Sequence, residues 1–376
     1  MPHVGGGVRW LQLPRIDVQI RPGGPEGSFR TYMTSEVLAH DRSDRTPYTN
    51  QIMPWMPEMQ DVLQARRVIA SYLPRTPLIA MPALSERLGF NLWLKAELVL
   101  PTGSFKVRGG LNFMSQLPAE IAARGVVTAS TGNHGQSIAF AAQAKGISAT
   151  IYVPEGANPL KVASMRRLGA EVRLEGSDFF ESCVAMDAFA ETSGAYRVHP
   201  ANEPPIIAGV GTYALEIFED LPSVDAIFVA VGGGSGLSGI TLVSQAINPR
   251  TRLFGVQSSG APAAYESWKA RELMKLDRME TFAEGIATRE AFDLPARIFW
   301  DQVEEIVLVS DTDIKKSMLT ILEQGRIVAE GAGAAALAAA VNRRDVLQGK
   351  NVVCVASGGN VTIEQLKQFM NEEQPW

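Results

Sequence analysis

Residues 225–239 read DAIFVAVGGGSGLSG, and this stretch decides the fold. Its first half, 225–231, is short, apolar and rich in β-branched side chains, as expected of a strand covered on both faces. Its second half, 232–239, contains five glycines in eight residues and leads into a helical segment. Glycines let backbone N–H groups converge on an anion, and a helix N-terminus adds its dipole. We therefore expect a phosphate site between a parallel strand and a helix.

The same stretch also admits a dinucleotide-binding interpretation. Residues 234–239 match the pattern GxGxxG. That pattern requires an acidic residue at the end of the next strand to hold a ribose hydroxyl. The next apolar run, 252–256, is followed by Gln257, so a phosphate without a ribose is favoured. A nicotinamide-dependent oxidoreductase is the alternative from another class of enzyme.

The composition excludes several classes of protein. The chain has 376 residues, of which 46% are hydrophobic, enough for the cores of two domains. Its 35 basic and 40 acidic side chains give a net charge of −5, which argues against a nucleic-acid or membrane-surface binder. Two cysteines and four dispersed histidines predict no disulfide framework and no metal site. With no secretory signal or membrane-length apolar stretch, we expect a cytoplasmic protein.

Short apolar runs alternate with helical segments along most of the chain. The other predicted strands are 126–129, 150–153, 172–174, 252–256, 306–309 and 352–356, and the predicted helices include 135–145, 159–168, 313–324 and 332–341. This alternation predicts an α/β fold of two three-layer α/β/α domains with parallel-type twisted sheets. Residues 1–55, with six prolines and clustered glycines, are predicted to form an N-terminal extension.

A second loop, 101–110, carries a lysine with unusual neighbours. Lys106 is flanked by Phe105 and small residues rather than by other charges, which suggests a partly buried amine. Burial lowers the pKa of a lysine and makes it a nucleophile toward carbonyl groups, as in Schiff bases. The alternative is an ordinary surface lysine with a buried stem.

Two further loops follow predicted strands. Residues 130–136 read STGNHGQ and suit a carboxylate or a phenolic oxygen, although a plain helix N-cap at Ser130 or Asn133 is the alternative. Residues 357–360 read SGGN and could equally form a simple turn. Taken together, a phosphate loop, a Schiff-base lysine and two polar glycine loops are what pyridoxal phosphate requires.

The four loops together resemble the motif set of a known enzyme group. Residues 104–109 (SFKVRG), 132–136 (GNHGQ), 232–237 (GGGSGL) and 357–360 (SGGN) resemble fold type II pyridoxal-phosphate enzymes, most closely the serine/threonine dehydratase and serine racemase family. The resemblance implies a tryptophan synthase β-like fold. It also implies a small domain, 125–201, inserted in a large cofactor-binding domain, 56–124 and 202–376, and a homodimer.

The resemblance assigns a role to each matching residue. Lys106 would be the catalytic residue, forming the Schiff base with pyridoxal phosphate and then removing the α-proton of an amino acid. The other implied contacts are Phe105 beside the pyridine ring, Asn133 on the phenolic oxygen, the backbone of Gly232, Gly233, Gly234, Ser235, Gly236 and Leu237 on the phosphate, Ser357 opposite the pyridine nitrogen, and Ser130, Thr131, Gly132 and His134 on the substrate carboxylate.

The implied reaction is β-elimination. A neutral hydroxyl at Ser357 leaves the pyridine nitrogen unprotonated, which favours loss of a β-substituent. We therefore expect dehydration and deamination of a 3-hydroxy amino acid (L-threonine, L-serine, threo-3-hydroxyaspartate or a bulkier analogue) to a 2-oxo acid and ammonia. A racemase of the same family is the alternative, disfavoured by Thr131 where those racemases have serine. Gln257 and Ala263 stand where metal-dependent relatives have carboxylates, so no metal is expected. Because little sequence follows residue 360, we expect a catabolic enzyme without a regulatory region.

Overall fold

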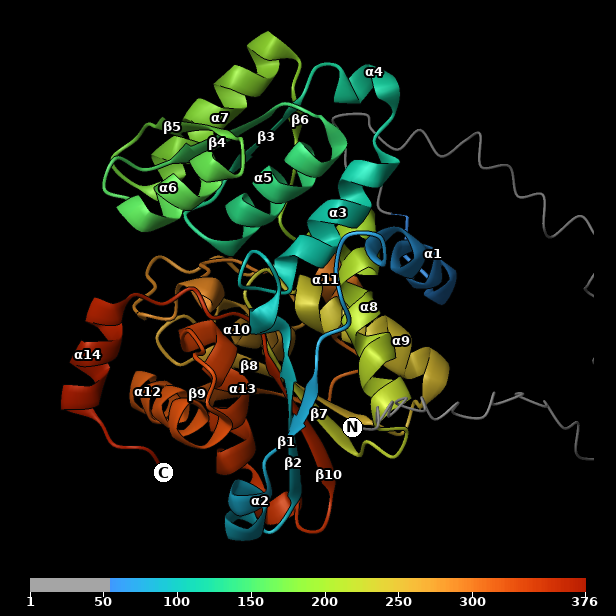
Figure 1. Cartoon of the computed structure of the whole chain (residues 1–376), viewed down its shortest axis with the longest axis vertical. Helices are drawn as coiled ribbons and strands as arrows, with labels where there is room; N and C mark the ends of the chain where they lie inside the picture. The colour runs from blue at the N-terminus through green and yellow to red at the C-terminus, as the bar shows by residue number, and fades with distance from the viewer. Residues whose placement is uncertain (1–54) are drawn as a thin grey trace, which may run out of the picture. The chain divides into compact units, whose positions relative to one another are not determined.

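Two β-sheets organise residues 55–376, the part of the chain that this computed structural model describes (Figure 1). The larger sheet has the strand order β1-β2-β10-β7-β8-β9. Its strands are β1 (Leu78–Ala80), β2 (Asn91–Ala96), β7 (Ala226–Ala230), β8 (Arg252–Ser258), β9 (Glu305–Val309) and β10 (Asn351–Ala356). The predicted extension, apart from Trp55, lies outside the described residues.

Most of the larger sheet is parallel, as the sequence predicts, but one edge is not. β1 pairs antiparallel with β2, with Ile79 opposite Leu94, whereas β2, β10, β7, β8 and β9 pair in parallel. This antiparallel edge adds to the predicted parallel sheet, since neither β1 nor β2 was among the predicted strands. The physical reason is the short connection, a single helix α2 (Pro82–Leu88), which turns the chain back beside the strand it has just left.

The smaller sheet is parallel throughout and has the order β5-β4-β3-β6. Its strands are β3 (Val126–Ala129), β4 (Ala149–Val153), β5 (Glu171–Leu174) and β6 (Tyr196–Arg197). The first three agree with the predicted runs to within one residue. The boundaries of the predicted small domain, 125–201, stay a prediction, since the described residues form one compact unit.

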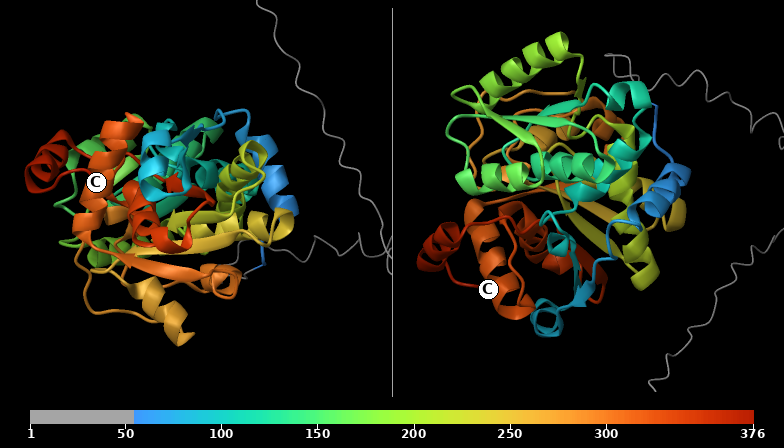
Figure 2. Two further views of the ribbon diagram at one scale, coloured as in Figure 1. Left: turned by 90° about the horizontal axis from the view of Figure 1, so that it is seen from below. Right: turned by 45° about the horizontal axis from the view of Figure 1, so that its top comes forward.

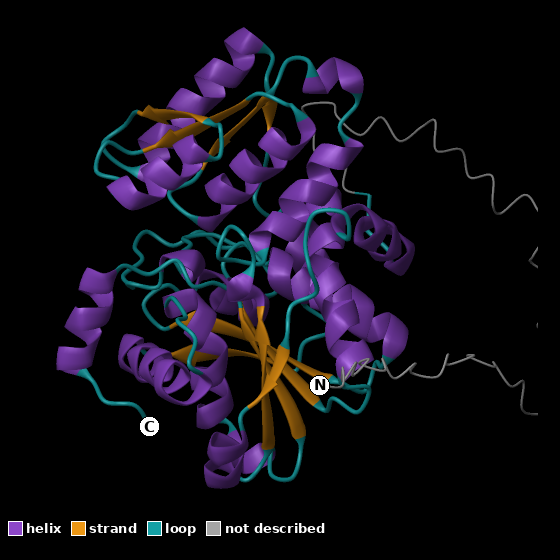
Figure 3. Cartoon of the chain, in the orientation of Figure 1, coloured by secondary structure: helices purple, strands orange, loops and turns teal. Residues whose placement is uncertain are grey.

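Helices cover both sheets (Figure 3). Beside α2, the α-helices are α1 (Met59–Ile69), α3 (Lys106–Gln116), α4 (Ala119–Ala122), α5 (Asn133–Lys145), α6 (Pro159–Arg167), α7 (Phe179–Ser193), α8 (Pro204–Asp220), α9 (Ser235–Ile247), α10 (Ala263–Ala270), α11 (Asp293–Phe299), α12 (Asp311–Thr320), α13 (Gly331–Asn342) and α14 (Ile363–Glu372). Short 3₁₀ turns are η3 (Glu97–Val99), η4 (Glu284–Ile286) and η6 (Arg344–Val346), and a π-helical turn, η5 (Ile321–Gly325), continues α12. None of the described helices combines the length and the apolar character needed to cross a membrane.

The core of the larger sheet depends on α13. Every residue of this helix from Gly331 to Val341 is buried, and it packs among apolar side chains of the sheet such as Phe228 and Phe254. Figure 1 shows α12, α13 and α14 on one side of the strands of the larger sheet and α1, α8 and α9 on the other, and the right-hand view of Figure 2 shows the same arrangement. The alanine-rich sequence of this segment explains the close packing, since small side chains let the helix approach the strands.

Helices α8 and α9 cross with their backbones in contact. A Cβ added at Gly239 would lie 2.7 Å from the backbone nitrogen of Gly211 and 2.9 Å from its Cα, closer than real Cβ atoms come. This approach sets the position of α9, whose N-terminus follows the glycine-rich loop.

We expect Gly239→Ala to lower the free energy of unfolding by about 1–3 kcal/mol, because the methyl group forces the two helices apart. Gly156→Ala is the matched control, since a Cβ there meets no atom within 4 Å. Denaturant unfolding of both variants and of the unchanged protein measures the difference. Equal stabilities of the two variants would contradict the proposed backbone contact.

Candidate active site

The loop that carries Lys106 and the loop after β10 are hydrogen-bonded to each other. The Phe105 nitrogen donates to the Ser357 oxygen at 3.1 Å, and the Gly359 nitrogen donates to the Gly103 oxygen at 2.9 Å. In parallel sheets, loops at the carboxyl ends of strands meet at one edge, and ligands bind there. The structure therefore brings together two of the four loops that the sequence singles out.

Lys106 begins α3 and extends its amine to the start of α9. Its Nζ lies 2.9 Å from Ser235 Oγ and 3.4 Å from the carbonyl oxygen of Pro200. Burial lowers the pKa of this amine to about 8. A substantial fraction of the amine is thus neutral, and nucleophilic, at mildly alkaline pH.

The glycine-rich loop after β7 leaves N–H groups at the start of α9 without helical acceptors. Gly234 is the N-cap residue, adopts a left-handed φ of 95° and has no side chain that could cap the helix. The first helical bond runs from the Ser238 nitrogen to the Gly234 oxygen, so the N–H groups of Ser235, Gly236 and Leu237 precede the helical ladder. Such a helix end is a ready site for an anion.

The positive charges around the start of α9 also favour binding of an anion. The ammonium of Lys106 lies beside the positive end of the α9 dipole, where two positive potentials add. An anion bound by the N–H groups of the loop would lower the electrostatic energy of the Lys106 ammonium and of the α9 N-terminus. The loop is closely packed as well, since a Cβ added at Gly232 would lie 2.3 Å from the Gly285 oxygen.

A buried ion network holds α3 from behind. Arg108, two residues after Lys106, donates from Nε to Glu97 Oε2 at 2.7 Å and from one terminal nitrogen to Glu216 Oε1 at 2.8 Å. Lys95 Nζ completes the network with a bond of 2.7 Å to Glu216 Oε2. All four side chains are buried, so the network fixes α3 against β2, η3 and α8.

The loop 130–136 divides into capping and open positions. Ser130 Oγ accepts hydrogen bonds from the Gly135 nitrogen at 3.0 Å and the Gly132 nitrogen at 3.3 Å, so its side chain stabilises the start of α5. Thr131 is only partly buried, and a Cβ added at Gly132 would meet no atom within 4 Å. The loop therefore leaves space beside Gly132, while the Ser130 hydroxyl accepts from an N–H of the first turn of α5 without being the N-cap residue of that helix.

His134 is a neutral group in this structure. Its Nε2 lies 3.4 Å from the Val198 oxygen, and burial together with the charge of Lys106 lowers its pKa to about 3. A neutral imidazole can bind a carboxylate through a hydrogen bond but not as a cation. The pKa of His199, on the chain segment beside Lys106, is lowered to about 4 for the same reasons.

Asn133 is the first residue of α5 and lies between two side chains from distant parts of the chain. Its Nδ2 donates to Glu330 Oε1 at 2.6 Å, and its Oδ1 accepts from Asn360 Nδ2 at 2.7 Å. The alternative of a plain N-cap at Ser130 or Asn133 is wrong, because Gly132 occupies the N-cap position.

Ser357 and Phe105 have partners within the protein. Ser357 is buried, and its hydroxyl donates to the Ala332 oxygen in the first turn of α13 at 3.3 Å. The ring of Phe105 meets Tyr213 edge-on with a centroid separation of 6.0 Å, and Tyr213 donates to the Gly236 oxygen at 2.9 Å. Through these contacts, α13 holds Ser357, and Tyr213 of α8 supports both the lysine loop and the glycine-rich loop.

Sequence reasoning assigned no role to Glu330, Tyr213 or Asn360. Glu330 is the acid directly before the apolar, alanine-rich helix, and this position is a weak sequence signal of a buried functional carboxylate. Asn360 stood inside a quoted motif but had no partner that the sequence could identify. Nothing local marks Tyr213, which lies within the apolar α8.

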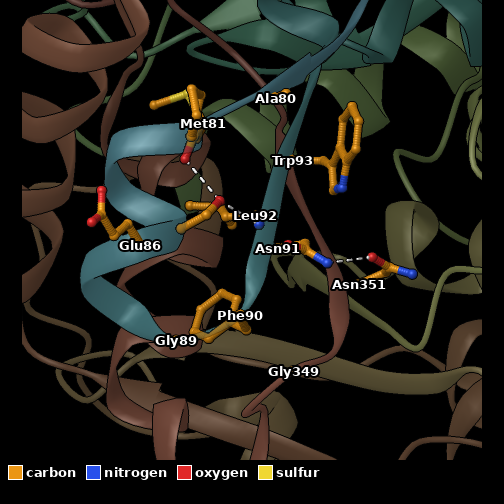
Figure 4. A pocket seen from close by; sticks show the side chains of 12 residues that line it. Ala80, Met81, Glu86, Gly89, Phe90, Asn91, Leu92, Trp93, Gly349 and Asn351 are labelled. Atoms are coloured by element: carbon orange, nitrogen blue, oxygen red, sulfur yellow. Dashed lines mark hydrogen bonds between the residues drawn. The ribbon is translucent and has the colours of Figure 1, made fainter.

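A cavity away from this site lies at the amino ends of two strands of the larger sheet (Figure 4). It has a volume of about 610 Å³ and is lined by Met81, Phe90, Leu92, Trp93 and Asn351 among others. Asn91 and Asn351 are the first residues of β2 and β10, so this cavity is at the amino ends of these parallel strands. Ligands of such sheets bind at the carboxyl ends, and the cavity contains none of the predicted site residues.

Comparison with known proteins identifies related chains. A family model described as "Pyridoxal-phosphate dependent enzyme" matches residues 69–358. The L-threonine ammonia-lyase of Thermotoga maritima is 41% identical over 314 residues, which cover 84% of this chain and 78% of that protein. The solved structure of maize serine racemase has a TM-score of 0.80 at 31% identity and covers 85% of this chain and 98% of its own. The processed form of threonine deaminase isoform 2 from Solanum lycopersicum has a TM-score of 0.79 at 30% identity, covering 85% and 95%.

In cofactor-free protein, we expect the amine of Lys106 to be acetylated by acetic anhydride at lower pH than an ordinary lysine, because burial lowers its pKa to about 8. Only the neutral amine reacts, and a solvated lysine titrates near pH 10.4. The rate at the peptide containing Lys106, followed by mass spectrometry, should reach half its maximum near pH 8. A midpoint near about pH 10 would contradict the burial argument, and Lys106→Ala controls for the identity of the modified residue.

Proposed function

Since the chain belongs to the pyridoxal-phosphate-dependent enzyme family, we propose that it is an ammonia-lyase that converts a 3-hydroxy amino acid to a 2-oxo acid and ammonia. The observation that carries this proposal is the amine of Lys106 at the N-terminus of α9, 2.9 Å from Ser235 Oγ. L-threonine is the first candidate substrate, because the relative at 41% identity is named an L-threonine ammonia-lyase. L-serine, threo-3-hydroxyaspartate and bulkier analogues are the others.

The residues of the site fit pyridoxal phosphate. The uncapped start of α9 offers N–H groups for a phosphate, and the adjacent ammonium of Lys106 adds a second positive potential. A partly neutral amine suits attack on the cofactor's aldehyde carbon. Asn133 supplies an amide donor for the phenolic oxygen, and the Ser357 hydroxyl would turn from the Ala332 oxygen to donate to the ring nitrogen.

When bound, pyridoxal phosphate supplies an electron sink that eases loss of the α-proton and of the β-hydroxyl from an amino acid. The protein's part is to hold the reactants and to move the proton. Lys106 Nζ is the base in this proposal, since its pKa of about 8 lets it accept a proton near neutral pH. The N–H groups of Ser235, Gly236 and Leu237 hold the phosphate in place.

The substrate carboxylate is assigned to the loop 130–134. Thr131, Gly132 and the neutral imidazole of His134 offer donors, while Ser130 keeps the loop in shape through its bonds to the nitrogens of Gly132 and Gly135. A helix N-terminus at Asn133 adds positive potential for the carboxylate. The uncharged Ser357 in place of a carboxylate supports elimination over transamination.

A racemase is the second candidate, because maize serine racemase shares the fold at 31% identity. Racemisation needs an acid–base group on each face of the α-carbon. The position of the second group falls on Thr131, whose hydroxyl makes no hydrogen bond to another described residue. Because threonine rather than serine holds this position, we rank elimination first.

We propose further that residues 56–124 and 202–376 form a large domain around the six-stranded sheet and that residues 125–201 form a small one around the other sheet. In support, β3 to β6 all lie within 125–201. An ion pair between Lys161 of α6 and Glu284 of η4 joins the two. A cytoplasmic location and a homodimer are also proposed, and light scattering of the purified protein would test the dimer.

We expect the purified protein with pyridoxal phosphate to release a 2-oxo acid from L-threonine, and Lys106→Ala to lose this activity by at least about 1,000-fold, because the nucleophile and base is removed. Coupled reduction of the 2-oxo acid, run across the 3-hydroxy amino acids named above, measures it. Lys269→Ala, at an exposed lysine of α10, is the matched control and should retain full activity. Inverted amino acid without 2-oxo acid would instead establish the racemase.

A further inference from the structure

We propose that Glu330 is a positioning residue: its carboxylate and the amide of Asn360 together fix the side-chain amide of Asn133, leaving one N–H of Asn133 for the phenolic oxygen of the cofactor. The inference rests on the proposed function in that it takes pyridoxal phosphate as the bound group. Sequence reasoning gave no role to Glu330.

The two partners of Asn133 determine which way its amide points. The ionised Glu330 Oε1 accepts from Asn133 Nδ2, at 2.6 Å, and Asn360 Nδ2 can only donate to Asn133 Oδ1, at 2.7 Å. Asn360 is itself fixed, because the same nitrogen donates to the Thr102 oxygen at 2.9 Å. A flipped Asn133 would place oxygen against oxygen and NH₂ against NH₂. The pair therefore selects a single orientation of the amide.

An asparagine side chain has two N–H donors and one carbonyl acceptor. In the described residues, one donor of Asn133 is used by Glu330 and the acceptor is used by Asn360. One donor is left, and its direction is fixed by the other two bonds. A donor whose orientation is set before binding loses less entropy when it meets its acceptor.

Glu330 is held rigidly in this position. Its backbone nitrogen donates to the Gly358 oxygen at 3.0 Å. The backbone of Gly358 packs directly on the bonded pair, since a Cβ there would lie 2.2 Å from Glu330 Oε1 and 3.1 Å from Asn133 Nδ2. The absence of a side chain at Gly358 thus makes room for the hydrogen bond between Glu330 and Asn133.

The carboxylate of Glu330 does not cap the helix that it precedes. Glu330 is the N-cap residue of α13, yet its side chain caps no N–H group of that helix. It is buried, which raises the pKa of its carboxyl and makes an ionised form costly unless donors compensate. The compensation comes from the Asn133 amide and the backbone of Asn360. The direction of these bonds links Glu330 to the cofactor site rather than to its own helix.

The test compares Glu330→Ala with Glu330→Gln in the full chain. Cofactor-free protein is titrated with pyridoxal phosphate, and the dissociation constant and the absorption maximum of the bound cofactor are recorded. We expect Glu330→Ala to weaken cofactor binding about 10-fold and to shift the absorption maximum, because the Asn133 amide is no longer held. Glu330→Gln should bind within about threefold of the unchanged protein, since its Oε1 accepts the same hydrogen bond.

Glu305→Ala is the matched control, because Glu305, the first residue of β9, forms an ion pair with Arg343 and contacts none of the site residues. Unaltered affinity and spectrum in Glu330→Ala would overturn the proposal, as would equal losses in both Glu330 variants. If Glu330→Ala does not fold, Asn360→Ala removes the second restraint on Asn133. This variant should show the same loss of cofactor affinity, about 10-fold, and the same spectral shift. Affinity and spectrum equal to those of the unchanged protein would overturn the proposal. Cofactor binding without 2-oxo acid formation would refute the ammonia-lyase and leave this test intact.

Discussion

The buried guanidinium of Arg108 is the constraint on which the site depends. It lies between the carboxylates of Glu97 and Glu216, and Lys95 shares Glu216, so two positive and two negative charges are enclosed together. Removing one member of such a network leaves an uncompensated buried charge, which typically costs about 3–5 kcal/mol. Because Arg108 is two residues from Lys106, the network that holds α3 also holds the reactive amine.

That amine is placed where positive potential accumulates. The amine of Lys106 lies at the start of α9, and two histidines nearby, His134 and His199, have lowered pKa values partly because of its charge. In the absence of an anion this arrangement is unfavourable, and a bound phosphate reverses the balance. The positive potential of this placement is therefore available to bind the phosphate of the cofactor, while burial lowers the pKa of the free amine.

Sequence patterns succeeded where burial is local and failed where it is not. β3, β4 and β5 were predicted to within one residue because each is a continuous apolar run between turns. β2 was missed because buried Lys95 interrupts its apolar pattern and its charge is compensated only by distant Glu216. β6 has just two residues, too few for any periodicity. The partners of Asn133 escaped prediction for the same reason, since Glu330 is 197 positions away.

The sequence by itself determined the kinds of chemistry present: a lysine among uncharged neighbours, a glycine-rich loop before a helix, and polar loops after strands. These are local properties, because backbone freedom and helix starts depend on adjacent residues. Only the tertiary structure decided that the Ser130 hydroxyl accepts from the first turn of α5, that Ser357 bonds to Ala332, and that Asn133 lies between Glu330 and Asn360. Such contacts arise where the carboxyl ends of parallel strands bring distant loops together, and that geometry follows from strand order rather than from any one segment.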